Sequence, residues 1–393
     1  MKVLLLYFNT IRYLKFSQIY HRVFRKFKKI VVFKNVTYQI LDKSKFFINA
    51  VLYDEKISVN FEAKFLGNTK ILRFPQDWND EANSKLWLYN IHYFDDLISE
   101  NHQSKHKFHL KLLDKWINEN PIGQGNGWEP YPSSLRICNI IKAWHFGLEL
   151  EKHHLDNLYY QASYLSKNLE KHLLGNHYLS NLKALLFAGT FFKNNVWSNT
   201  AVKELLYEID EQILDDGGNF ELSPMYHSLC LVDMLDMYNL LNAYHDNESL
   251  LSTIKTKILK MLDYMDKMAH PNNELSFFND SVNGVAPTKN RIEEYAKNLG
   301  FNLHRNPLLI DATFFQNSGY MVGIHSGNKL IFDTGSVGPD YIPGHAHADT
   351  LSFEFSIGDE RVFVNSGISE YGASSKRLDQ RKTKSHSTLE ING

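Results

Sequence analysis

The spacing of apolar residues changes partway along the chain, and this change limits its fold more than any other feature. Between about residues 106 and 270, apolar positions recur at the period of an amphipathic helix. One such stripe comprises Leu231, Met234, Leu235, Tyr238 and Leu241. After the segment HPNNELSFFNDSVNG, residues 270–284, the period is two, as in half-buried strands. We therefore expect a helical unit followed by a β unit.

The first unit is predicted to consist of helical hairpins. Short connections rich in Gly, Asn or Pro separate the helical patterns, and such connections join antiparallel neighbours. The predicted helices cover residues 106–118, 133–150, 155–173, 177–192, 199–214, 225–243 and 249–268. We assign residues 1–285 to this helical domain.

The second unit is predicted to be an antiparallel β domain over residues 286–393. In TLSFEFSI, residues 350–357, apolar and polar residues alternate, and GDE then turns the chain into RVFVN. A second hairpin is predicted in GYMVGIHSGNKLIFDTG, with its turn at SGN. STLEING reads as one more strand. Only about 80 residues of this unit are readable, so we expect a chain truncated at its C-terminus.

The length and charge of the chain limit its class. Domains usually hold about 100–200 residues, so 393 residues favour two domains and an α+β, multidomain fold class. The 43 Lys and Arg nearly balance the 44 Asp and Glu, so no overall charge favours nucleic acid. The two cysteines, Cys138 and Cys230, lie in apolar helical patterns and are expected to be buried thiols.

The N-terminus, MKVLLLYFNTIRYLKFSQIYHRVFRKFKK, has a short apolar run broken by Asn9 and Arg12. It has no small-residue cleavage site, so we expect no signal peptide and a cytoplasmic location, with the periplasm as the alternative. No stretch approaches the roughly 20 apolar residues of a membrane-spanning helix. This basic, amphipathic start either packs as a first helix or contacts an anionic membrane surface peripherally.

Two helix starts carry candidate chemical groups. In GNHYLSN, Asn176 is either a helix N-cap or, with His177, binds and neutralises a carboxylate at the positive end of a helix. In NFELSPMYHSL, Ser223 and Pro224 start a helix that carries Tyr226 in its first turn. Tyr226 either packs or, if nearby positive charge lowers its pKa, exchanges protons.

A loop and a strand entrance carry two further clusters. The segment GWEPYPSSLRI brings together Trp128, Glu129, Tyr131 and Arg136, which either bind a sugar ring or form a buried ion pair under aromatic cover. In HAHAD, His345 and His347 project to the same side of an extended chain, and His386 returns later. These imidazoles either form an open metal site or are hydrogen-bonded surface histidines.

Taken together and in this order, these segments resemble the heparinase II/III-like polysaccharide lyases, which include heparinase II, heparinase III and related alginate lyases. The resemblance rests on WLYNIHYFDDL, GWEPYPSSLRI, GNHYLSNLKALLFAG, FELSPMYHSL, GHAHADTLSFEF and SHSTLEING, and spans nearly the whole chain. It implies an incomplete (α/α) toroid followed by the antiparallel sheets of a β-sandwich. The change of period supports the same architecture.

The resemblance also implies a chemistry, namely β-elimination on a uronate-containing polysaccharide. It assigns Asn176 and His177 to neutralising the substrate carboxylate, Tyr226 to principal acid or base, and His345 to neutraliser or alternate base. Tyr371 and Arg381 are implied to bind substrate. The start TIRYLKFSQIYHRVFRKF further resembles members associated with bacterial surface-polysaccharide gene sets.

The family's structural zinc is implied to lie in the β domain. His347 and His386 match two of its ligands by position, whereas Asn365 stands where the family has an Asp. A neutral amide is a much poorer zinc ligand than a carboxylate, so this departure weakens the expected site.

The leading hypothesis is therefore a lyase acting on an acidic polysaccharide or oligosaccharide. A glycoside hydrolase is the first alternative, although such enzymes use paired carboxylates and the sequence places no pair among Glu129, Glu221, Asp233 and Asp349. A non-catalytic glycan-binding or assembly protein is the second alternative.

Overall fold

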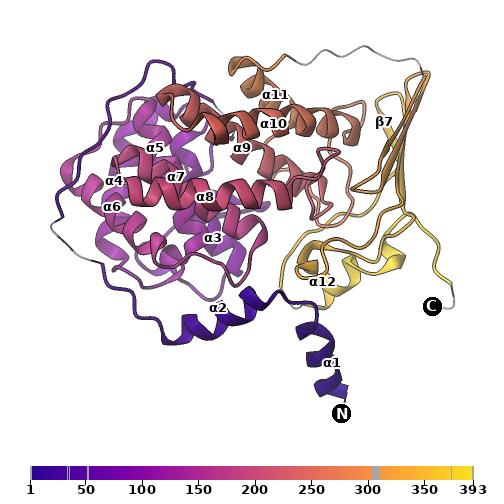
Figure 1. Ribbon diagram of the computed structural model, residues 1–393, viewed down its shortest axis with the longest axis horizontal. Coiled ribbons are helices and arrows are strands. Elements are labelled where there is room, and N and C mark those ends of the chain that lie inside the picture. Colours follow the sequence, from indigo (N-terminus) through magenta and orange to yellow (C-terminus); the bar gives the residue numbers. More distant parts are fainter. Residues whose placement is uncertain are drawn as a thin grey trace.

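The computed structural model describes residues 2–32, 34, 36–50, 53–302, 310–372 and 374–391. A helical domain and a five-stranded sheet lie side by side, with the N-terminal helices along one edge (Figure 1). The helices are α1 Lys2–Ile11, α2 Phe16–Phe27, α3 Lys85–Tyr93, α4 His106–Glu119, α5 Pro130–His145, α6 Lys152–Ser166, α7 Gly175–Phe191, α8 Asn195–Gln212, α9 Pro224–Tyr244, α10 Glu248–Met268, α11 Lys289–Asn298 and α12 Ser375–Gln380.

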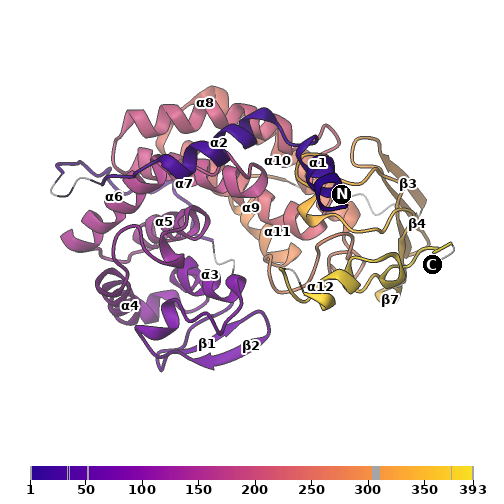
Figure 2. The ribbon, with the colours of Figure 1, turned by 90° about the horizontal axis from the view of Figure 1, so that it is seen from below.

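The helical domain has two layers, as an (α/α) toroid requires. Helices α5, α7 and α9 are buried over most of their length, as is typical of helices at the centre of a domain. Helices α4, α6, α8 and α10 bury a single stripe and cover them. Figure 2 shows these helices arranged in a curved, open array. The helices predicted from the apolar spacing are thus confirmed, with shifts of up to seven residues at their ends.

The helical domain extends beyond its predicted end at residue 285. Helix α11 buries Ile292, Tyr295 and Ala296 in the same hydrophobic core as α5, α7 and α9, and Phe301 follows them. The boundary therefore lies after residue 302, because α11 needs this core to cover its apolar face.

The sheet is an antiparallel meander in the order β3, β4, β5, β6, β7. Its strands are β3 Ile310–Phe315, β4 Tyr320–His325, β5 Asn328–Asp333, β6 Phe353–Ile357 and β7 Glu360–Phe363. Both predicted hairpins are confirmed, as β4–β5 and β6–β7. The strand predicted in STLEING is wrong for its described residues 387–391, which form no strand. Ser387 and Thr388 make isolated hydrogen bonds to Phe353, Val364, Asn365 and Thr350 rather than a ladder. A separate hairpin joins β1 Glu62–Phe65 and β2 Asn68–Ile71.

One face of the sheet packs against the helical domain. Val322 and Ile331 share a core with Tyr264 and Met268 of α10, and the Tyr320 hydroxyl donates to the carbonyl of Leu222 at 2.8 Å. This contact places the loops of the β domain next to the first turns of α7 and α9. The candidate site lies at this junction.

Candidate functional site

A buried carboxylate, Asp280, organises the junction between the two domains. Its Oδ2 lies 2.8 Å from His345 Nδ1, and its Oδ1 lies 2.7 Å from His347 Nε2. The Arg377 guanidinium of α12 donates to Oδ2 at 2.6 Å. Burial raises the pKa of Asp280, but these three partners outweigh it and lower the pKa below its ordinary value. Asp280 is therefore ionised at neutral pH and accepts hydrogen bonds from both histidines.

His345 lies between two carboxylates. Its Nδ1 faces Asp280, and its Nε2 lies 3.4 Å from Oε2 of Glu221, which is also buried. Burial lowers the pKa of His345, but Glu221 and Asp280 outweigh burial and raise it above the ordinary value. The site thus favours a positively charged imidazole that remains partly exposed to solvent.

Tyr226, in the first turn of α9, packs against His345. The two ring centroids lie 3.9 Å apart, and the Tyr226 hydroxyl donates to the Tyr371 hydroxyl at 3.0 Å. Ser223 caps the helix, as predicted, by accepting from the backbone N–H of Tyr226. Burial, followed by the neighbouring Tyr371, raises the pKa of Tyr226 well above its usual value. The lowered pKa on which proton exchange by Tyr226 was made conditional is therefore not found, and the phenol keeps its proton.

Asn176 lies in the first turn of α7 and is not its N-cap. The helix begins at Gly175 and the N-cap is Leu174, so the Asn176 side chain is not used for capping. The Asn176 backbone N–H points to Glu221 Oε1 at 3.4 Å. Gly175 has φ +59°, and a Cβ there would lie 2.8 Å from Glu221 Oε1. Only glycine therefore lets this helix start approach the carboxylate.

His177, the next residue, is held by Glu170 and Tyr131. Its Nδ1 lies 3.2 Å from Glu170 Oε1, and its ring stacks on Tyr131 with centroids 4.4 Å apart. Because the carboxylate takes Nδ1, the Nε2 atom remains for a substrate. The His177 side chain is 31% exposed, so a ligand can reach it.

Trp128 and Arg136, predicted to bind substrate, lie in the core. Trp128 is 2% exposed, and its indole N–H donates to the carbonyl of Asn120. Arg136 is fully buried, with its guanidinium 3.8 Å from the Trp116 ring centroid and bonded to the carbonyl of His92. These two predictions are corrected, because both side chains are buried and their N–H groups donate to backbone carbonyls of neighbouring segments.

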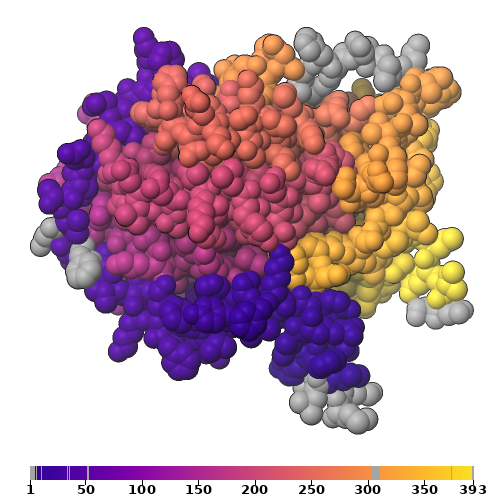
Figure 3. Space-filling view, in the orientation of Figure 1, coloured from indigo at the N-terminus to yellow at the C-terminus, as the bar shows by residue number. Residues whose placement is uncertain are grey.

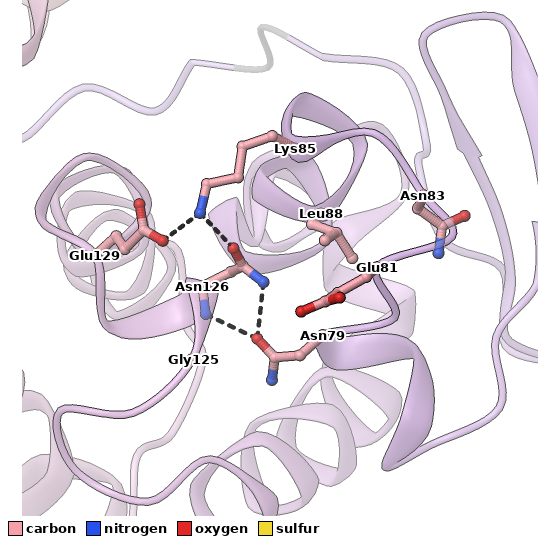
Figure 4. Close-up of a pocket in the computed structure, with 8 residues that line it drawn as sticks. All are labelled: Asn79, Glu81, Asn83, Lys85, Leu88, Gly125, Asn126 and Glu129. Atoms are coloured by element: carbon pink, nitrogen blue, oxygen red, sulfur yellow. Dashed lines mark hydrogen bonds and ion pairs between the residues drawn. The ribbon is translucent and has the colours of Figure 1, made fainter.

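Glu129 lies in a hollow of about 500 Å³ at the start of α5. Its carboxylate binds Lys85, which also donates to Asn126 (Figure 4). The hydroxyl of Tyr89 donates to the same carboxylate. Tyr131, two residues further on, contacts His177 instead. Glu129 thus lines a hollow whose lining includes no residue of the candidate site, and its charge is already paired with Lys85.

The two substrate-binding predictions in the β domain have different outcomes. Tyr371 joins the site through its bond to Tyr226. Arg381 does not, because its guanidinium donates to the carbonyl of Ala346 at 2.7 Å, between the two histidines of HAH. Arg381 therefore positions His345 and His347 through the backbone, which corrects its predicted contact with an acidic group.

Comparison with known proteins places this arrangement in a family. The heparinase II/III N-terminal model matches residues 38–302, and the heparinase II/III-like C-terminal model matches residues 308–393. The chain belongs to the heparinase II/III family. Its curated relatives include a heparin-sulfate lyase of Pedobacter heparinus, 31% identical over 139 residues, and one of Bacteroides stercoris, 25% identical over 245 residues.

Heparinases with solved structures share the fold. A crystal structure of heparinase III superposes with a TM-score of 0.62 at 20% identity, covering 95% of this chain and 66% of that chain. A mutant heparan sulfate lyase of Pedobacter heparinus superposes with a TM-score of 0.54 at 20% identity, covering 85% and 59% of the two chains. The curated matches cover 31% and 56% of this chain but only 21% and 36% of those relatives. The chain therefore spans only part of the length of these heparinases.

The zinc expected in this family is only partly matched by the side chains. Asp280 takes Nε2–H of His347, which leaves the lone pair of Nδ1 directed at His386 Nε2, 3.2 Å away. Two imidazoles on one tetrahedral zinc would hold their nitrogens about 3.3 Å apart, so this pair fits. Asn365 adds only a neutral oxygen, which already accepts from the Ser387 N–H at 3.0 Å. The set thus lacks the anionic third ligand.

Several residues of the candidate site were not predicted from the sequence. Asp280 stands in an apolar stretch, SFFND, with no neighbouring motif. Arg377 and Glu170 lie on other segments and meet their histidines only through the fold. Glu221 was considered only as a hydrolase carboxylate, although its place in FELSPMYH, five residues before Tyr226, was a usable signal.

Proposed function

We propose that the chain is a polysaccharide lyase that cleaves an acidic, uronate-containing glycan by β-elimination. The observation that carries this proposal is His345, held between Glu221 and Asp280 with its ring packed against the phenol of Tyr226. It places a positive charge beside a proton donor. Family membership and the relatives described as heparin-sulfate lyases support the same reaction class.

The first requirement of this reaction is neutralisation of the substrate carboxylate. The proton on carbon 5 of a uronate is weakly acidic until the charge developing on the adjacent carboxylate is stabilised. The His345 imidazolium and the Asn176 amide, at the first turn of α7, provide that stabilisation.

The second requirement is a base and an acid. His177 takes the carbon 5 proton on Nε2, because Glu170 holds its Nδ1 as a donor. The C5–H electrons form the C4=C5 double bond and the C4–O4 bond breaks. Tyr226 gives its proton to the departing O4, which fits a phenol that keeps its proton at neutral pH.

Zinc would have a structural part in this proposal. Bound between His347 and His386, it would fix the HAH segment, and no step of the elimination would pass through it. His345 would still be oriented by Asp280.

The test is ultraviolet absorbance of the unsaturated uronate formed from a panel of acidic glycans, starting with heparan sulfate because of the relatives' names. We expect absorbance with wild type and a loss of about 10²–10⁴-fold in kcat for both Tyr226→Phe and His177→Gln. Glutamine keeps a hydrogen-bond donor but cannot accept the proton. Near-wild-type turnover of His177→Gln would therefore return His177 to the neutralising role and overturn its assignment as base.

The same panel separates the alternatives. A hydrolase would release products with no double bond. The four carboxylates named for that role have other partners: Glu129 binds Lys85, Asp233 binds Lys183, Asp349 accepts from the Asn279 N–H, and Glu221 faces His345. A binding protein would retain the glycan without forming any product, whether or not Tyr226 is replaced.

A further inference from the structure

The first two helices precede the segment that the family's N-terminal model matches, which begins at residue 38. Helix α2 runs along the outside of the helical domain, and α1 lies at the end of α2 that is nearer the β domain (Figures 1 and 2). In the space-filling view they form a ridge on the surface (Figure 3).

Helix α2 contacts the protein through its polar face. Gln18 is 1% exposed, and its amide donates to the carbonyls of Leu173 at 3.3 Å and Tyr341 at 3.5 Å. One turn later, Arg22 Nε donates to the carbonyl of His172 at 3.4 Å. Arg25, on the same stripe, lies 2.7 Å from His172 Nε2.

The apolar face of α2 points to solvent. Phe16, Tyr20, Val23 and Phe27 follow one stripe at spacings of four and three, and Phe16 and Phe27 are 81% and 80% exposed. A surface helix normally turns such a stripe inward, so this helix is inverted. The exposed apolar surface continues on α1 with Leu5, Tyr7, Phe8 and Ile11.

The charge of this segment is of one sign. No Asp or Glu occurs before Asp42. The basic residues of the same stretch are Lys2, Arg12, Lys15, Arg22, Arg25, Lys26, Lys28, Lys29 and Lys34. Lys26, Lys28 and Lys29 are exposed beside the apolar stripe.

We propose that α1 and α2 bind the surface of an anionic lipid bilayer. Such a surface offers an apolar layer that can bury the aromatic stripe and negative headgroups that can pair with the lysines around it. Among the described residues, no helix combines the length and the apolar character needed to cross a bilayer. The two helices therefore lie in the interface, with their long basic side chains reaching the headgroups.

Docking of α2 would also orient the candidate site. The carbonyls that accept from Gln18 belong to Leu173, four residues before His177, and to Tyr341, four residues before His345. The helix thus ties both segments to the lipid-binding face. This inference does not depend on the proposed reaction.

The test is co-sedimentation of the full chain with vesicles of phosphatidylcholine alone or of phosphatidylcholine with phosphatidylglycerol. We expect at least about tenfold stronger binding to the anionic vesicles, weakened by added salt. Phe16→Ser combined with Phe27→Ser should lower that binding by at least about tenfold. Lys26→Glu, Lys28→Glu and Lys29→Glu together should abolish the preference for anionic vesicles without touching the apolar stripe.

The matched control is Phe314→Ser, which removes an exposed aromatic ring from the outer face of the sheet and should leave vesicle binding unchanged. Equal binding of wild type to both vesicle types, or none to either, would overturn the proposal. So would a dimer in analytical ultracentrifugation that dissociates in the Phe16→Ser, Phe27→Ser variant, because a second copy would then cover the stripe.

Discussion

Glu221 Oε2 lies 3.4 Å from His345 Nε2 and has no other hydrogen-bond partner among the described residues. This buried carboxylate, whose other oxygen accepts from the Asn176 N–H at 3.4 Å, is costly unless the facing imidazole carries a positive charge. The pair therefore explains why the pKa of His345 is raised although burial alone would lower it. The two carboxylates thus favour the charge that the proposed reaction needs.

Glu221→Gln should lower the pKa of His345, because one of its two carboxylate neighbours is removed. The charged imidazole stabilises the fold below the ordinary histidine pKa, and this contribution is lost as the pH rises through the raised pKa. In Glu221→Gln, this contribution to stability is lost at a lower pH than in wild type. We expect the basic limb of the kcat profile to move to lower pH, with turnover at pH 8 reduced about tenfold and less at pH 6. An NMR titration of His345 measures the pKa directly.

Glu274→Gln is the control for this experiment, since Glu274 pairs with Arg361 at the surface. It should leave both the titration and the profile unchanged. A Glu221→Gln variant with the wild-type pH profile would show that the charge of His345 has no part in turnover.

Asp280→Asn should destabilise the protein by about 3–5 kcal/mol at pH 7, because Arg377 would be left without its buried carboxylate. The pKa of Asp280 is lowered, so its contribution is complete above the ordinary value of 3.8 and is lost as the pH falls through the lowered pKa. The difference between wild type and variant should therefore shrink in strong acid. Urea unfolding at pH 7 and pH 3 measures it, with the exposed Asp379→Asn as control.

The sequence predicted the fold well because the signals of helix and strand period are local. It predicted the strand β6 but not which face is buried: Glu354 and Ser356 face the interior and bond to His270, whereas Ile357 is exposed. Alternation shows that the two faces of a strand differ in polarity, but the segment that packs against the strand decides which face is buried. Here a buried imidazole on a distant segment pairs with the polar face.

The candidate site was only partly predictable for a related reason. Tyr226, His345 and Asn176 lie in recognisable motifs at element ends, and the fold brings them together through Glu221. Arg136 was misassigned because nothing in GWEPYPSSLRI tells a loop that binds a ligand from one that binds its own backbone. Asp280 could not be found, because its partners lie more than sixty residues away.

Asn365→Asp should create the zinc site that the wild-type side chains complete only in part. A carboxylate adds the missing negative ligand beside His347 and His386, so we expect about one zinc per chain after dialysis, and less than that in wild type. Mass spectrometry of the metal content measures this, and added zinc should raise the Tm of the variant more than that of wild type. Asn365→Ala is the control. Equal zinc content in wild type and Asn365→Asp would show that the amide suffices.

Asp333→Asn should stabilise the protein at alkaline pH. Burial, and then the neighbouring Asp349, raise the pKa of Asp333 to about 7. The folded protein therefore holds this proton more tightly than the unfolded chain, and stability falls as the pH rises from about 4 to about 7, at about 1.4 kcal/mol per pH unit. Asparagine keeps an oxygen to accept from the Gly335 N–H but carries no charge.

The variant should unfold several degrees above wild type at pH 8 and at the same temperature near pH 4. Asp311→Asn, which removes a surface partner of Lys267, should show no such gain. Stability curves for wild type and Asp333→Asn that run parallel from pH 4 to 8 would contradict a protonated Asp333.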